Sequence, residues 1–533
     1  MNLNLFTVFI IICATLFLPS KLLAQQEKEC SQTDKVHFKP NDIFNLEDDD
    51  SIFIHDWANF LHIKTKQDTL ENEAAFFLKK CEVNYDDLLE LERHLRNQKY
   101  IRDAKVKYDE NNLVSVETWD NWTLLPTIDF SRKGGKNKFA IGIRDRNLLG
   151  LGIGAEIEYF SNEQRTGYRL DTQFPLYLKN NINASITLTS NDDGSSKAAF
   201  INKQFVSFDT QYAYQIGFDN FSQIDTQFEL GQQSNRFSHE QRFSTIAWQW
   251  LQTNSSTDTL RFGVGYTRES HRFSDLIKNA LNETNLLPND REFNYPFVSI
   301  EYLQKDFRKL TNLHLINHIE DYNLGWHVSA SIGTDFSDRD NAPSLIWQSN
   351  LSKGIELSEN ALVYFDVSLE GEQYNNSQQQ DRVLLKTSAE YFYKFNQHWG
   401  AYFKNANVIS DNQYLDSPVV LGGETGVRGY PLQYQHATKS TQFTAEARYY
   451  PQINIYKLLE LGGAAFIDSG KVFDQSESSE KQSSLMTSVG LGARFYSTRT
   501  SEARVIHIDV IKPISSDPNV NSVEFRVTTK HRF

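Results

Sequence analysis

His314, His318 and Glu320 are the residues whose types and spacing come nearest to a chemical site. On a single strand, spacings of two and four place all three side chains on one face, and imidazoles with a carboxylate can bind zinc. The competing interpretation is a group of polar side chains beside a turn that starts at Glu320 and Asp321. We favour the turn, and therefore expect no metal site and no cofactor.

Motifs of the common catalytic sites do not occur in the chain. It contains no G-x-S-x-G turn, no H-E-x-x-H helix, no G-x-x-x-x-G-K phosphate loop and no C-x-x-C pair. We therefore expect no enzymatic activity. Cys30 and Cys81 remain once Cys13 is assigned to the leading apolar segment. In an exported chain they could form a disulfide or stay as two thiols.

The composition narrows the fold class. Hydrophobic residues make up 39% of the 533 residues, yet the chain holds 24 Tyr and 37 Phe, and the mean hydropathy is -0.52. A helical membrane protein needs runs of about 20 apolar residues, and a disordered chain would leave its aromatics in water. Two classes remain: a soluble β-protein, or a membrane β-barrel, whose alternating strands hide its apolar face from any average.

The N-terminus has the pattern of a secretory signal peptide. Leu5 to Leu18 is the apolar run, and we expect cleavage after Ala24, so that residues 1–24 are removed. A retained membrane anchor is the alternative. Removal takes away one Lys and leaves 53 basic and 68 acidic residues, a net charge of -15. That balance argues against nucleic acid as a partner.

The elements that must position any site fall into two parts. Residues 25–120 predict a small α+β domain with a helix over Asp86–Gln98 that Asn84 or Asp86 caps, a possible helix over Asp56–His62, and a short strand over Leu70–Leu78. Two alternating stretches ending at Thr118 predict a hairpin. The acidic run 47–50 is expected to be a solvated loop.

Residues 121–533 predict an antiparallel transmembrane barrel. About 20 alternating stretches follow one another, joined by short turns on one side and longer loops on the other. In the last of them, Val523, Phe525 and Val527 alternate with Glu524 and Arg526. The chain ends on Phe533, which suits an interfacial aromatic girdle. The terminal strand therefore favours the barrel over the soluble β-protein.

Three motifs resemble one family. Val427-Arg428-Gly429-Tyr430 resembles the signature of the BamA/TamA superfamily of bacterial surface antigen type, the outer-membrane assembly and translocation barrels related to two-partner secretion transporters. Phe466-Ile467-Asp468-Ser469-Gly470 resembles its F-x-D-x-G strand, and 145–150 its D-x-N-L-x-G turn. Residues 25–120 resemble a single polypeptide-transport-associated (POTRA) domain. The resemblance covers nearly all of the chain beyond residue 24.

The resemblance implies a loop folded into the barrel lumen. Arg428 would meet Asp468 there, with Glu446 as a second inward carboxylate, since an unpaired buried charge costs several kcal/mol. The loop glycines, such as Gly429, give backbone freedom. The alternative is a surface hairpin with an exposed Arg428. The resemblance also implies 16 strands, against about 20 from the pattern.

Two functions follow as hypotheses. The resemblance implies an outer-membrane protein, its N-terminal domain in the periplasm, that helps to insert or translocate other polypeptides. The alternative is a passive outer-membrane pore, which the acidic net charge would make cation-selective. For either we expect a monomeric barrel among outer-membrane lipids, with polypeptide substrates in the first case.

Overall fold

The computed structural model describes residues 36–47, 52–80, 83–110, 113–133, 136–176, 181–276, 286–337, 342–375, 379–423, 425–473, 484–500 and 505–530. The signal peptide 1–24, Cys30, Cys81 and Phe533 lie outside these residues, so the expectations attached to them stay predictions. Within these ranges no helix has the length and apolar character to cross a membrane.

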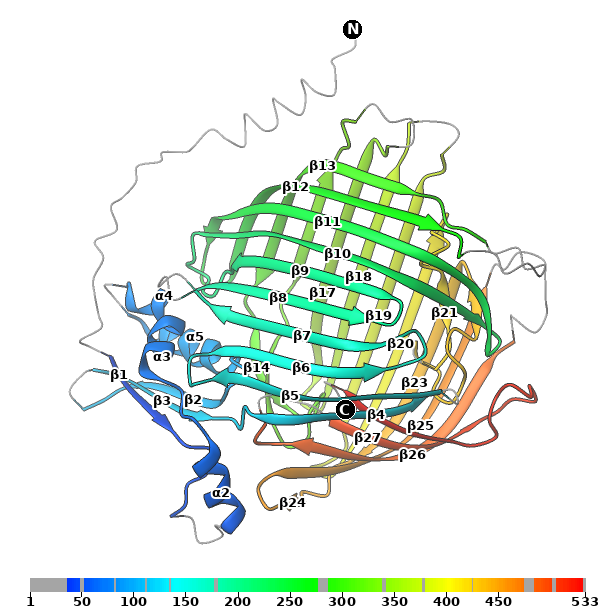
Figure 1. Ribbon diagram of the computed structural model, residues 1–533. Coiled ribbons are helices and arrows are strands. Elements are labelled where there is room, and N and C mark those ends of the chain that lie inside the picture. The colour runs from blue at the N-terminus through cyan, green and yellow to red at the C-terminus, as the bar shows by residue number, and fades with distance from the viewer. Residues whose placement is uncertain are drawn as a thin grey trace.

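The N-terminal part is an α+β unit at one end of the molecule (Figure 1). Its central strand β3 pairs in parallel with β1 and antiparallel with β2. The elements are β1 (Val36–Asn41), α2 (Phe53–Leu61), α3 (Gln67–Glu73), α4 (Ala75–Leu78), α5 (Tyr85–Arg96), β2 (Ile101–Tyr108) and β3 (Val114–Asp120).

Helix α5 follows the predicted pattern. Leu88, Leu91 and Leu95 form its buried face against the sheet. The Asn84 side chain accepts a hydrogen bond from the Asp87 amide at 2.9 Å, while Asp87 accepts one from the Asn84 amide at 2.9 Å. These two bonds satisfy amides that the first turn leaves open, so Asn84 begins the helix.

The strand predicted over Leu70–Leu78 is wrong, because these residues form α3 and α4. Leu70, Ala74 and Phe77 are fully buried at spacings of four and three. That spacing is one face of a helix and not the alternation of a strand. The helix predicted over Asp56–His62 is present as α2, which begins earlier and ends at Leu61.

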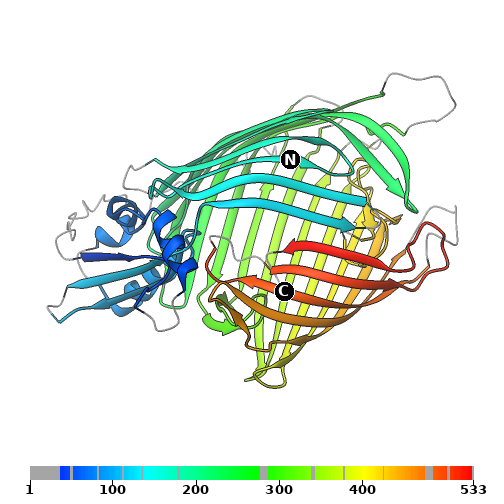
Figure 2. The same cartoon turned by 60° about the horizontal axis from the view of Figure 1, so that its bottom comes forward.

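The second part is a closed antiparallel barrel (Figures 1 and 2). Among the described residues twenty strands form its wall, with the two-residue β24 (Asn454–Ile455) as an extra pairing on β25. The wall runs through β4 (Leu125–Lys133), β5 (Lys136–Leu148), β6 (Ile153–Ser161), β7 (Thr166–Pro175), β8 (Ile182–Asn191), β9 (Gly194–Lys203), β10 (Tyr212–Glu229), β11 (Gln232–Asn254), β12 (Asp258–Ser274), β13 (Arg291–Gln304), β16 (His327–Gly333), β17 (Leu345–Ser358), β18 (Ala361–Gln373), β19 (Arg382–Lys394), β20 (Trp399–Asp411), β23 (Lys439–Tyr449), β25 (Leu459–Phe473), β26 (Met486–Ser497), β27 (Val505–Pro513) and β28 (Glu524–Lys530).

The strand count agrees with the sequence pattern, and the 16 strands implied by the resemblance are wrong for this chain. The barrel closes where the last strand β28 lies beside the first strand β4. We call this junction the seam. Seven residues make up β28 and nine make up β4, whereas β11 has 23. The seam is therefore formed by short strands.

The two faces of the wall have opposite chemistry. Large apolar side chains are exposed on the outside, and examples are Ile128, Ile141, Ile246, Trp248, Phe443, Leu491, Val510 and Phe525. Charged side chains are buried on the inside, and examples are Arg144, Glu156, Arg382, Glu390, Arg448, Asp468, Arg494, Asp509 and Arg526. An apolar outer belt around a charged interior is the pattern of a membrane barrel.

We call the end of the barrel beside the α+β unit the base. The sequence predicts short turns there, but one connection at the base is longer. Between β13 and β16 the chain forms a separate hairpin, β14 (Phe307–Thr311) with β15 (Ile319–Asn323). Leu313 packs with Phe392 and Tyr402 of the barrel wall, and Leu315 with Tyr450 and Tyr496. This base hairpin, residues 307–323, therefore occupies the lumen at the base.

Candidate functional site

The connection between β20 and β23, residues 412–438, is the lumen loop. It carries the short hairpin β21 (Val419–Leu421) with β22 (Gln435–Ala437). The Leu230 amide at the end of β10 donates to the Tyr434 carbonyl at 3.0 Å, and Arg526 of β28 donates to the Gly423 carbonyl at 3.1 Å. The loop thus contacts strands far from the two that it joins, across the end of the barrel opposite the base.

Arg428 of the lumen loop lies against Asp468 of β25. Its Nε donates to Oδ2 at 2.5 Å and its Nη2 to Oδ1 at 2.8 Å, which is a two-pronged pair. Thr444 donates to the same carboxylate at 2.9 Å, and the guanidinium lies 3.4 Å from the centre of the Phe466 ring. Asp468 is completely buried. The alternative prediction, a surface hairpin with an exposed Arg428, is therefore wrong, since Arg428 is buried.

Glu446 of β23 connects the pair to the base hairpin. One of its oxygens lies 3.1 Å from Arg428 Nη2, and the other accepts from Arg448 Nε at 3.0 Å. Arg448 then donates to the Leu313 carbonyl of the base hairpin at 2.7 Å. A continuous chain of ion pairs ending in a hydrogen bond therefore joins the lumen loop to the base hairpin through the interior.

The remaining residues of the two motifs bring the loop close to the wall. Gly429 has φ +88°, and a Cβ there would lie 2.7 Å from Pro513 of β27. A Cβ on Gly470 would lie 2.8 Å from Leu421. The Tyr430 hydroxyl accepts from the Thr487 amide at 3.2 Å and lies 3.2 Å from the Ile514 carbonyl. Gly429 and Gly470 are therefore needed for the lumen loop to lie this close to the wall, because a Cβ at either position would clash.

The turn at 145–150 is the docking point of the α+β unit. Asn147 donates to the Thr65 hydroxyl at 2.8 Å, and the Gly150 carbonyl accepts from Thr69 at 2.8 Å. Gly150 has φ +74°, and a Cβ there would lie 2.3 Å from the Lys64 carbonyl. Only glycine combines that backbone with so close an approach.

Helix α5 adds a second docking contact. Glu90 accepts from the Phe208 amide at 2.7 Å and from Ser207 at 3.1 Å, both in the β9–β10 turn. Burial raises the pKa of the Glu90 carboxyl. Arg96 lies 3.0 Å from Asp321 of the base hairpin. The α+β unit therefore touches both the barrel rim and the base hairpin.

His314, His318 and Glu320 do not share one strand, since they belong to the base hairpin and its turn. Glu320 accepts hydrogen bonds from the Leu313, His314 and Leu315 amides at 3.0 to 3.2 Å. Its carboxylate thus closes the turn that precedes it, and the turn predicted to start at Glu320 and Asp321 is wrong, because both residues lie in β15. These three residues are not among the groups of the described chain whose donor atoms converge as metal ligands do.

Several site residues had no signal that we recognised in the sequence. Arg448 and Arg526 lie on strands where alternation predicts only an inward side chain. Their partners, the Leu313 and Gly423 carbonyls, are 135 and 103 residues away. The base hairpin was not predicted because His314 to Glu320, which include its turn, were assigned to one strand.

Comparisons with known proteins give structural likeness at low identity. No family model and no curated protein matches the chain. Among solved structures it is similar to BamA of Haemophilus ducreyi lacking POTRA domains 1–3, at 12% identity and a TM-score of 0.38, covering 87% of this chain and 81% of that one. It is also similar to CdiB of Escherichia coli, at 9% identity and a TM-score of 0.45 over 87% and 73%, and to CdiB of Acinetobacter baumannii, at 9% and 0.42 over 87% and 72%.

Proposed function

We propose that this protein is an outer-membrane barrel of the BamA/TamA superfamily that inserts or translocates other polypeptides. The motifs around Arg428, Asp468 and Asn147 support the family. The apolar belt and the charged interior support a place in a membrane. In this proposal the signal peptide directs export, and the α+β unit is a POTRA domain in the periplasm.

The observation that carries the proposal is a lumen entered from both ends. The lumen loop crosses the end opposite the base, the base hairpin enters at the base, and Glu446 with Arg448 links the two. A passive pore needs an open aqueous path through its barrel. A lumen that segments cross from both ends instead suits a barrel that works on its substrate at the seam.

The α+β unit supports substrate capture by strand addition. Its sheet has two edges, β1 and β2. On β2 the Val106 amide already donates to Glu92 at 3.2 Å, and the Ala104 amide to Asp103 at 2.9 Å. We therefore assign the capturing edge to β1 (Val36–Asn41), where an extended substrate segment would pair with the backbone.

The seam supports release into the bilayer. Arg526 of β28 donates to the lumen loop at Gly423, and Gly429 of the same loop packs on Pro513 of β27. The loop therefore holds the last two strands from inside. Movement of the loop would loosen β28 against β4 and open the wall sideways for a substrate strand.

Conductance distinguishes this function from the passive pore. The purified protein in a planar bilayer is expected to show little steady current, because the lumen loop crosses the end of the barrel opposite the base. Deleting residues 414–436 is expected to open a steady current. A large steady current from the intact protein, cation-selective and unchanged by the deletion, would instead identify a pore.

A further inference from the structure

We propose that His239, His271 and Asp416 form a binding site for a divalent transition-metal ion, with Zn²⁺ as the best fit. His239 lies on β11, His271 on the neighbouring β12, and Asp416 on the lumen loop. One donor atom from each residue lies within 4.8 Å of the other two. All three side chains are at most 9% exposed. The site is separate from the Arg428 pair and from the proposed handling of polypeptides.

The hydrogen bonds of the two imidazole rings are the first argument for a bound ion. His239 Nδ1 lies 2.7 Å from Asp225, and His271 Nε2 lies 2.8 Å from Glu269. A carboxylate only accepts, so each of these nitrogens carries a proton. The other two nitrogens, His239 Nε2 and His271 Nδ1, then face each other at 2.9 Å, and their lone pairs repel unless a shared proton or a cation lies between them. A cation between them resolves this conflict.

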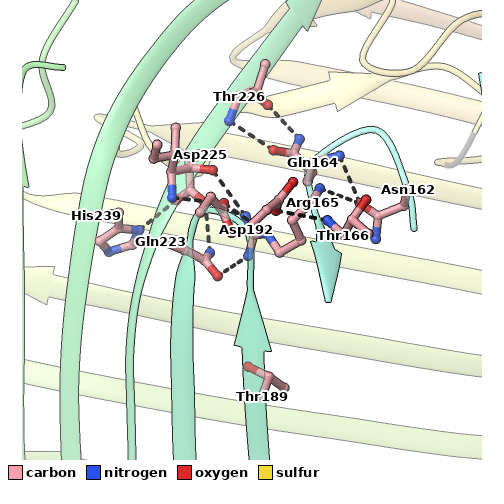
Figure 3. Close-up of polar contacts among 12 residues, drawn as sticks. Asn162, Gln164, Arg165, Thr166, Thr189, Asp192, Gln223, Asp225, Thr226 and His239 are labelled. Carbon is pink, nitrogen blue, oxygen red and sulfur yellow. Dashed lines mark hydrogen bonds and ion pairs between the residues drawn. The ribbon is translucent and has the colours of Figure 1, made fainter. Parts of the chain in front are cut away.

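The carboxylates are the second argument. Metal-binding histidines usually donate their other ring N–H to a carboxylate, which fixes the tautomer and the ring orientation. Asp225 and Glu269 stand in that relation to the two rings. Figure 3 shows Asp225 between His239 and Arg165, which reaches it from the β6–β7 turn. Both rings are therefore held with their free nitrogens pointing at one spot.

Distances and access also fit zinc. Two nitrogens bound tetrahedrally at Zn–N distances of about 2.0–2.1 Å lie about 3.3 Å apart, so the rings need to separate by about 0.4 Å. His271 and Glu269 line a lumen cavity of about 600 Å³, which gives an ion a path to the site. Three protein ligands leave a fourth position, which water can fill from that cavity.

The charged side chains around the site favour a cation, because they include more carboxylates than guanidinium groups. Asp225, Glu269 and Asp416 are three carboxylates. Arg291 pairs with Asp416 through two bonds of 2.8 Å, and Arg165 lies 3.4 Å from Asp225. Each Asp416 oxygen uses one lone pair toward Arg291 and keeps another for an ion. The bound ion would fasten the start of the lumen loop to the β11–β12 wall.

Zinc titration of the full-length protein in detergent, first stripped with EDTA, tests this site. We expect one high-affinity Zn²⁺ per chain by calorimetry and elemental analysis. Co²⁺ at the same site is expected to give the visible absorption of a tetrahedral ion with nitrogen ligands. His271→Gln should lower zinc affinity at least about 100-fold, and Asp225→Asn, which alters only a positioning partner, about 10- to 100-fold.

The control is His398→Gln, since His398 lies exposed in the β19–β20 turn at the base; its zinc affinity should match the wild type. Should His271→Gln fail to fold, Asp416→Asn tests the same site from the loop. The proposal is overturned if the wild type takes up no zinc. It is equally overturned if His271→Gln and Asp416→Asn bind as the wild type does; the two rings then share a proton.

Discussion

Replacing Arg428 by alanine is expected to destabilise the barrel by about 3–5 kcal/mol, because it leaves a buried charge without its partner. Asp468 is fully buried, and its two oxygens face the two nitrogens of this one guanidinium. Neither Thr444 nor the Phe466 ring can replace that charge. The change should appear as a lower urea midpoint in gels that separate folded from unfolded barrel. It should also release the lumen loop and abolish most insertion activity.

Three further variants isolate the pair itself. Arg428→Lys keeps the charge but loses the two-pronged pairing with Asp468. Its stability should therefore fall between that of the wild type and that of Arg428→Ala. Arg428→Ala combined with Asp468→Asn removes both charges and should be more stable than Arg428→Ala alone. Arg242→Ala, at an exposed ion pair with Glu240, should change stability by less than about 1 kcal/mol. If the double variant is the less stable one, the pair does not hold the loop.

Closing the seam with a disulfide is expected to stop polypeptide insertion without unfolding the barrel. In a Cys30→Ser/Cys81→Ser background, a cysteine at Val527 of β28 is combined with one at Pro126, Ile128 or Phe130 of β4. Neighbouring strands bring one such pair within bonding range, and oxidation identifies it. Proteoliposomes with the oxidised pair should no longer fold an added unfolded barrel substrate, and a reducing agent should restore the rate.

The matched control places the same bond away from the seam. Val510 of β27 and Phe525 of β28 are directly opposite each other and both face outward. A disulfide between them joins two strands that the proposed mechanism keeps together. This variant should insert substrate at the wild-type rate when oxidised. Equal activity of the seam-bonded and control proteins would remove the seam from the mechanism.

Much of the architecture could be predicted because alternation and helical spacing are local signals. The β28 pattern predicts Glu524 and Arg526 inside and Phe525 outside, and all three are found there. Asn84 and the leucines of α5 likewise predict a helix that exists. The Leu70–Leu78 error had a local cause as well, since apolar residues at spacings of four and three indicate a helix and not a strand.

The rest depends on how distant segments meet. The base hairpin lies inward because Leu313 and Leu315 pack on wall residues that are distant in the sequence. The contact of Arg448 with the Leu313 carbonyl joins two elements that no local pattern connects. His239, His271 and Asp416 are scattered over three elements, and their approach depends on the path of the lumen loop. The Arg428–Asp468 pairing was implied by resemblance, not by spacing.

The most direct test of the account is where the working protein touches a polypeptide. A photoreactive amino acid is placed at Val527 on the outer face of the seam, and separately at Ile300 on the outer face of β13, far round the wall. In cells, the account predicts cross-links to other polypeptides from Val527 and only to lipid from Ile300. Identical products at both positions, or lipid alone at both, would contradict it.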